Sequence, residues 1–167
     1  LVVRNDLAIQ PLLHGGGQEL RRRAGTENVP AIAGLGWALD HLPNLTHLTS
    51  WRDQLASRIQ KHIGRSVVIG EGADRLGNTL SILMPGVASE TQLMHFDLQG
   101  ICVSAGSACS SGRIEISHVL KAMGYSDAES GSVIRVSMGW GTKESDLEAF
   151  LQSWVTLYQR LGSKAAA

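Results

Sequence analysis

The sequence predicts a mixed α/β protein in which a small sheet is covered by helices. Short runs rich in Val and Ile alternate with longer segments whose apolar residues recur every three or four positions, the pattern of strands alternating with amphipathic helices. The 167 residues, 43% of them hydrophobic, are enough for one core or slightly more. The pattern of residues changes near Pro43 and Asn44, where we expect a domain boundary. We therefore expect two domains, over 1–43 and 44–167.

The first domain is expected to contain strand and turn over 1–13, a glycine-rich loop over 14–19 and a basic run over 21–23. A helix should begin near Pro30, because proline in a first turn loses no helical hydrogen bond, and it should end at Pro43. Its apolar face is formed by Ile32, Leu35, Ala38, Leu39 and Leu42.

The second domain should open with a helix over 46–63, where apolar residues recur at spacings of three and four. Strands are expected over 66–70 and 79–84. The next helix should run over 89–98 and begin with a capping box made by Ser89 and Gln92.

The rest of this domain should contain a short strand over 101–103, a helix over 116–123 and a strand over 133–138. Thr142 is expected to cap a long final helix. One face of that helix carries Leu147, Leu151, Trp154, Tyr158 and Leu161.

Composition narrows the class of protein. Fifteen basic and fifteen acidic residues cancel and form no aromatic-backed basic patch, so direct nucleic-acid binding is not expected. No apolar run predicts a membrane span, and the two cysteines stand in dissimilar surroundings, which fits a reducing cytoplasm. Because the chain starts at Leu1, in an apolar run typical of the end of a strand, we expect it to be a fragment.

Cys109 is the candidate nucleophile. It stands in S-A-G-S-A-C-S-S-G, among small residues that leave its thiol unobstructed and its backbone free to move. Such a thiol suits the transfer of a group between two places, whereas Cys102 stands in an apolar run typical of packing. An ordinary loop cysteine is an equal alternative, because no activating residue is adjacent and His118 is expected to cap or pack within a helix.

Arginines and glycines offer candidate anion sites. Gly15–Gly17 either cradle a phosphate or only make a turn, and Arg21–Arg23 either bind an anion beside that loop or form a solvated face. Arg135 interrupts an apolar strand, so it either points to solvent or holds a carboxylate in a cleft. No ligand spacing predicts a metal site.

The motifs H-G-G-G-Q-E, R-x-G-T-E-N-V-P, S-A-G-S-A-C-S-S-G, S-H-V-L-K-A-M-G and I-R-V-S-M-G follow one another in this order. This ordered set resembles the group I cysteine desulfurases, the NifS/IscS-like branch of the class V aminotransferases. The resemblance implies the C-terminal portion of a fold-type I pyridoxal-phosphate (PLP) enzyme. Residues 1–43 would end the large cofactor-binding domain, and residues 44–167 would form the small domain.

The resemblance also implies an activity. The enzyme would take sulfur from L-cysteine, leaving alanine and a persulfide on Cys109, which would lie in a mobile loop over 104–111. Thr26 matches the residue that reaches the cofactor phosphate of the partner subunit in a homodimer, and Arg135 matches the arginine that binds the substrate carboxylate. His14 and Gln18 would lie near the site, and Arg23 aligns with the motif arginine without a defined role.

The family's Schiff-base lysine would precede the first residue of this chain, so the chain alone is expected to be inactive. Its implied partners are a second copy and a sulfur acceptor, such as an iron–sulfur scaffold or a thiolation protein. Two alternatives stay open. One is another enzyme of this fold, such as a selenocysteine lyase or a transaminase, and the other is a non-enzymatic sulfur carrier or interaction module.

Overall fold

The computed structural model describes residues 3–106 and 116–162. The chain divides into two compact units, Leu1–Pro43 and Asn44–Ala167. In the described residues no helix is both long and apolar enough to cross a membrane. The fold is mixed α/β, as the sequence predicts, and its sheet is small and antiparallel.

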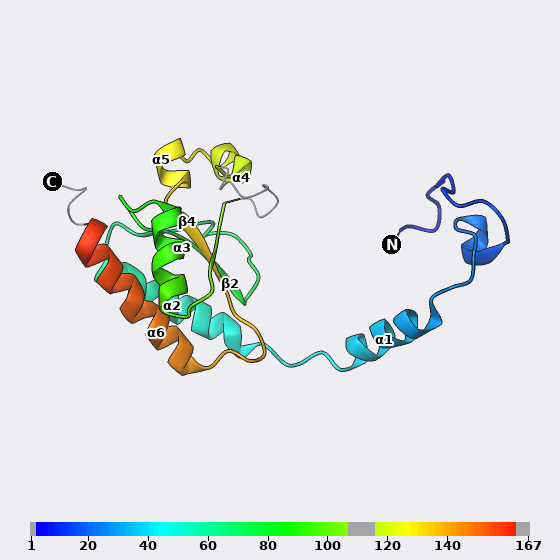
Figure 1. Cartoon of the computed structure of the whole chain (residues 1–167), viewed down its shortest axis with the longest axis horizontal. Coiled ribbons are helices and arrows are strands. Elements are labelled where there is room, and N and C mark those ends of the chain that lie inside the picture. The colour runs from blue at the N-terminus through cyan, green and yellow to red at the C-terminus, as the bar shows by residue number, and fades with distance from the viewer. Residues whose placement is uncertain (1–2, 107–115, 163–167) are drawn as a thin grey trace. The chain divides into compact units, whose positions relative to one another are not determined.

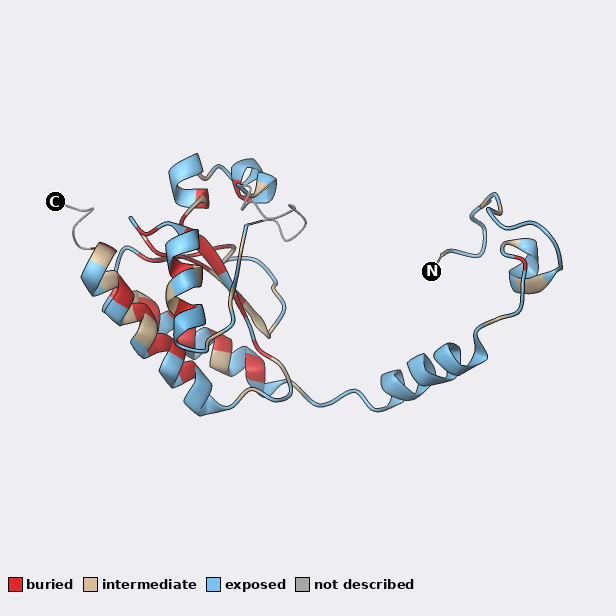
Figure 2. Ribbon diagram, in the orientation of Figure 1, coloured by how far each residue is buried: buried red, intermediate tan, exposed pale blue. Residues whose placement is uncertain are grey.

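Over its described residues, 3–43, the first unit contains one short turn, η1 (Gln18–Arg21), and one helix, α1 (Val29–Asp40), and the strand expected over 1–13 is absent from 3–13. The expected helix forms with Pro30 in its first turn, but it ends at Asp40 and not at Pro43. The side chain of Asn28 accepts a hydrogen bond from the N–H of Ala31 at 3.2 Å. Asparagine is favoured at this position because it satisfies an N–H that has no partner within the helix. No residue of α1 is buried (Figure 2).

The second unit is built on four antiparallel strands in the order β1-β2-β4-β3. Figure 1 shows β2 and β4 with α2, α3 and α6 in this unit. Their bounds are β1 Val67–Val68, β2 Thr79–Leu83, β3 Ser104–Ala105 and β4 Val133–Ser137. The helices are α2 His47–His62, α3 Ser89–Leu98, α4 His118–Ala122, α5 Asp127–Ser130 and α6 Glu144–Leu157, with the π-turn η2 Tyr158–Gly162 at its end.

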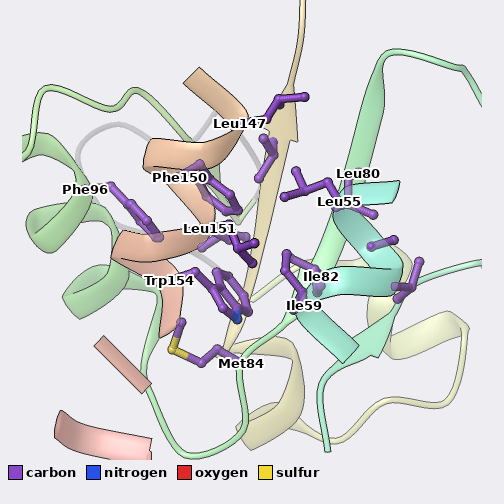
Figure 3. Close-up of a cluster of buried hydrophobic side chains, with 14 of the residues drawn as sticks. Leu55, Ile59, Leu80, Ile82, Met84, Phe96, Leu147, Phe150, Leu151 and Trp154 are labelled. Carbon is purple, nitrogen blue, oxygen red and sulfur yellow. The ribbon is translucent and has the colours of Figure 1, made fainter. Parts of the chain in front are cut away.

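Helices α2, α3 and α6 cover one face of the sheet and enclose the main core with it (Figure 3). Alternate residues of a strand point to opposite faces, so Ile134 and Val136 of β4 enter this core while Arg135 between them points to the other face. Phe96, Phe150 and Trp154 pack together at its centre, with ring centroids 4.9 to 6.4 Å apart.

The other face of the sheet is only partly covered. Ile69, Leu83 and Val133 form a small buried cluster there with Leu120 of α4. Beyond this cluster the same face carries Arg135, which is exposed. The incomplete cover leaves this part of the second face open to a ligand.

Two expected caps are wrong. Ala88 caps α3, and no capping box forms, because the buried amide of Gln92 donates instead to the carbonyls of Val87 and Ser132. The cap of α6 is Lys143, whose N–H donates to the carboxylate of Asp146, while the hydroxyl of Thr142 accepts from the N–H of Gly139.

The strand expected over 101–103 is displaced along the chain. Pairing with β4 begins at Ser104. The apolar side chains of Ile101 and Val103 pack against the main core instead.

Candidate functional site

Arg135 lies at the middle of a row that crosses three strands. Its cross-strand neighbour on β2 is Ser81 and its neighbour on β3 is Ser104. Residues directly opposite in antiparallel strands have Cβ atoms about 4.5–5.5 Å apart and share one face of the sheet. On the less covered face, Arg135 is therefore flanked on the two neighbouring strands by residues with small hydroxyl side chains.

These three residues line one cavity of about 310 Å³. The rest of its wall is mostly apolar and comes largely from β4, α4 and the residue after β1, and no acidic residue contributes to it. The full lining is Ile69, Ser81, Ser104, Ala105, Gly106, Ser117, Val119, Leu120, Met123, Val133, Ile134 and Arg135.

The guanidinium of Arg135 has neither a hydrogen bond nor an ion pair with any residue in the described part of the chain. By contrast, Arg52, Arg58, Arg22 and Arg23 all bind carbonyl or carboxylate oxygens. A planar guanidinium matches a carboxylate in a two-point contact. Arg135 is thus available to an anionic ligand that enters the cavity.

Cys109 lies outside the described residues, but Gly106 before it and Ser117 after it both belong to the described part of the chain. Gly106 follows β3, and Ser117 caps α4 by accepting from the N–H of Leu120 at 3.5 Å. Both residues line the cavity. Gly106 has φ +62°, a conformation that favours glycine, so the chain turns there as it leaves β3.

Thr26 lies in the first unit, at a turn just before α1, and it is exposed. Gly25 has φ +95°, and the guanidinium of Arg23 donates to the backbone oxygens of Gly25 and Thr26 at 3.3 and 3.2 Å. Arg23 therefore braces the turn that presents Thr26. The sequence alone assigns Arg23 no role, because its partners are backbone carbonyls that no spacing rule identifies.

A second cavity, of about 300 Å³, lies within the first unit and is lined by Gly15–Gly17 with His14 and Arg21 among others. Of the three consecutive arginines, Arg22 donates to the carbonyl of Asn5 at 2.8 Å and Arg23 braces the turn, which leaves Arg21 beside the glycines. Of the three consecutive arginines, Arg21 is thus the one that shares a cavity with the glycine loop. Gln18 does not line this cavity.

The described lysines lie elsewhere. Lys61 is in the last turn of α2, Lys121 forms an ion pair with Asp127 at 2.9 Å, and Lys143 caps α6. None of them lines the cavity of Arg135. His118, expected to cap or pack, is exposed at the first position of α4. Over the described ranges, no three His, Cys, Asp or Glu residues are grouped as a metal site.

Comparisons with known proteins show the family. The aminotransferase class-V family model matches residues 8–150. The cysteine desulfurase of Klebsiella pneumoniae is 34% identical over 165 residues, which are 96% of this chain and 42% of that protein. This chain therefore spans about two-fifths of the length of the curated relatives it matches.

Solved structures also superpose on most of this chain while this chain covers less than half of each of them. The NifS-like protein from Rickettsia africae superposes with a TM-score of 0.69 at 34% identity, over 92% of this chain and 41% of that one. The structure described as SspA in complex with cysteine superposes with a TM-score of 0.51 at 32% identity, over 77% of this chain and 35% of that one.

Proposed function

The chain belongs to the class-V aminotransferase family, and we propose that its activity is that of a PLP-dependent cysteine desulfurase. In this proposal L-cysteine gives up its sulfur, alanine is released, and a persulfide is left on Cys109. The similarity to named cysteine desulfurases supports this choice. Residues 1–43 would complete a large cofactor-binding domain and residues 44–167 would be the small domain.

One observation carries the proposal. Arg135 lines the same cavity as Gly106, the last described residue before Cys109, and Ser117, the second described residue after it. A carboxylate held by Arg135 would place the rest of an amino acid near a thiol tethered at Gly106. The similar structure that contains cysteine supports a ligand of this class.

The chemistry assigned to Cys109 is balanced without an external oxidant. Its thiolate forms an S–S bond to the sulfur of L-cysteine while the C–S bond breaks. The electron pair of that bond passes to the former Cβ, which takes up a proton and becomes the methyl group of alanine. The transferred sulfur is oxidised to the sulfane level and the carbon is reduced. PLP, when bound, supplies an electron sink for the amino acid.

The described residues fit part of a PLP site. Thr26, presented on the turn braced by Arg23, is our candidate for a contact with the cofactor phosphate, and Arg135 is our candidate for the substrate carboxylate. No described lysine fits the Schiff-base role, because none lines the cavity of Arg135. We therefore propose that these 167 residues alone do not turn over cysteine.

The partners in this proposal follow from the chemistry. A second copy of the chain would receive Thr26 at its cofactor, as in a homodimer. An acceptor protein with a free thiol would take the sulfur from Cys109, in iron–sulfur cluster assembly or thiolation. The reaction fits a cytoplasmic setting in which thiols stay reduced.

A chimera tests the function directly. These 167 residues would replace the matching 42% of the Klebsiella pneumoniae relative, and alanine and persulfide formation from L-cysteine would be measured with PLP. We expect turnover that Cys109→Ser abolishes, and no turnover by the 167 residues alone. Alanine formation that survives Cys109→Ser would refute the desulfurase, and turnover by the short chain would refute its proposed inactivity.

A further inference from the structure

The row Ser81–Arg135–Ser104 carries a further inference, which rests on the proposed function. We propose that the hydroxyls of Ser81 and Ser104 form the carboxylate subsite together with the guanidinium of Arg135. The subsite would span strands β2, β4 and β3 and bind the α-carboxylate of an amino acid. The two serines would be substrate-binding residues that share this group with the arginine.

The register places the three side chains in line. Ser81 and Ser104 are the residues directly opposite Arg135 on its two neighbouring strands, and all three line the same cavity. Cross-strand neighbours are about 5 Å apart at Cβ. Because all three residues also line one cavity, a ligand in that cavity can meet both hydroxyls and the guanidinium.

The hydrogen-bonding capacity of the row is unused. Within the described residues, the side chains of Ser81, Arg135 and Ser104 have no hydrogen-bond or ionic partner. The backbone, by contrast, is paired through the β2–β4 and β3–β4 ladders. Each of these side chains therefore has a donor to offer a ligand, while the strands fix where it stands.

The chemistry of a carboxylate fits this set of donors. Its two oxygens have about four lone-pair positions, and a guanidinium fork occupies only two of them. One hydroxyl on either side can donate to the remaining positions. Two short side chains also leave the guanidinium open, whereas a large residue at either position would cover it.

Ser137 provides a matched control. It lies two residues from Arg135 on β4, it is exposed on the same face of the sheet, and it does not line the cavity. Ser137→Ala removes the same hydroxyl group as the test substitutions, from the strand that carries Arg135, and leaves the proposed subsite intact.

The experiment is a titration of the ¹⁵N-labelled 167-residue chain with L-alanine, followed by NMR at the Nε–Hε signal of Arg135. Ethylamine, which lacks the carboxylate, is the ligand control. We expect L-alanine to shift the signal and ethylamine to leave it unchanged. Ser81→Ala and Ser104→Ala should each raise Kd about threefold to tenfold, the effect of one net hydrogen bond. Ser81→Thr and Ser104→Thr should restore binding, and Ser137→Ala should leave it unchanged.

Each outcome decides a different point. Unchanged Kd in both Ser→Ala variants would overturn the serine subsite and leave Arg135 as the carboxylate site. If the Nε–Hε signal of Arg135 does not shift when L-alanine is added, the subsite as a whole is refuted. A serine-dependent response together with an inactive chimera would keep the subsite and refute the desulfurase. Unchanged thermal unfolding of the Thr and Ala variants confirms that a loss of binding is not a loss of fold.

Discussion

Gln92 offers a sharp test of how the sheet that carries Arg135 is held. Its side chain is fully buried, and its Nε2 donates to the backbone oxygens of Val87 at 2.8 Å and Ser132 at 2.9 Å. Ser132 immediately precedes β4. The substitution Gln92→Glu keeps the size of the side chain and replaces an NH₂ donor by a carboxylate oxygen that faces two carbonyl oxygens.

The expected magnitude follows from these contacts. Among described residues the carbonyl of Val87 has no other partner, while that of Ser132 keeps the N–H of Met84 at 3.0 Å. An unpaired buried carbonyl costs about 1–3 kcal/mol, and a lost second bond about 1 kcal/mol. An uncompensated buried charge brings the total to about 3–5 kcal/mol. We expect Gln92→Glu to lower the free energy of unfolding by that amount at pH 7.5.

The assay is urea unfolding followed by circular dichroism, with Gln54→Glu as the control. Gln54 is exposed on α2 and donates to the hydroxyl of Ser50 at 2.8 Å, a hydroxyl that can donate in turn to a carboxylate. That change should stay within about 0.5 kcal/mol. Equal unfolding midpoints for the two variants would refute the assignment of Gln92.

A pH series adds a second criterion. Burial raises the pKa of the introduced carboxyl in the folded chain above the unfolded value of about 4.3. The destabilisation should therefore be smallest below about pH 4.3, where both states are protonated, and grow as pH rises from there until it levels off above the folded pKa. A destabilisation that does not change with pH would show that the carboxylate escapes to solvent.

Three further predictions concern other contacts. In the chimera, Arg135→Lys should raise KM for cysteine about tenfold with a smaller change in kcat, because a point charge cannot replace the planar fork; an unchanged KM would remove the carboxylate role. Arg52 is buried, and its Nη1 donates to the carbonyl of Leu76 at 2.7 Å; Arg52→Lys should cost about 1–3 kcal/mol in urea unfolding and speed proteolysis between residues 71 and 78, and unaltered cleavage would contradict this. The hydroxyl and then the backbone N–H of Ser126 donate to Glu129 and lower the pKa of that carboxyl. The stability gained from this contact is present above the unfolded pKa and is lost as pH falls through the folded one, so Ser126→Ala should raise the pKa of Glu129 in an NMR titration.

Periodicity predicted the elements whose residues face the core. Helix α2 was expected over 46–63 and runs from His47 to His62, because Leu48, Leu55 and Ile59 bury one face of it. The strands β2 and β4 were likewise predicted within one residue of their ends. A repeat of buried positions is a local property that the sequence displays directly.

The errors fall where a side chain has a distant partner. Ser89 and Gln92 have capping-box spacing, but the amide of Gln92 binds Ser132, forty residues away, and local spacing cannot show that bond. For the same reason, local sequence does not identify Ser81 and Ser104 as neighbours of Arg135. Only the pairing of β2 and β3 with β4 places them beside Arg135. Cys109 and Thr26 stay predictions as functional residues, supported by motif order.

In the proposed function, the position of Gly106 also bears on how the thiol of Cys109 would be delivered. Cys109 is three residues from Gly106 and seven from Ile116, and an extended chain spans at most about 3.5 Å per residue. Three residues of chain can therefore span no more than roughly 10 Å from Gly106. A nucleophile tethered in this way would act at a high effective concentration, so its encounter with an amino acid bound in the cavity would not depend on the protein concentration. Inserting residues between Gly106 and Cys109 would lower the effective concentration of the thiol. The longer segment between Cys109 and Ile116 does not limit its reach any further.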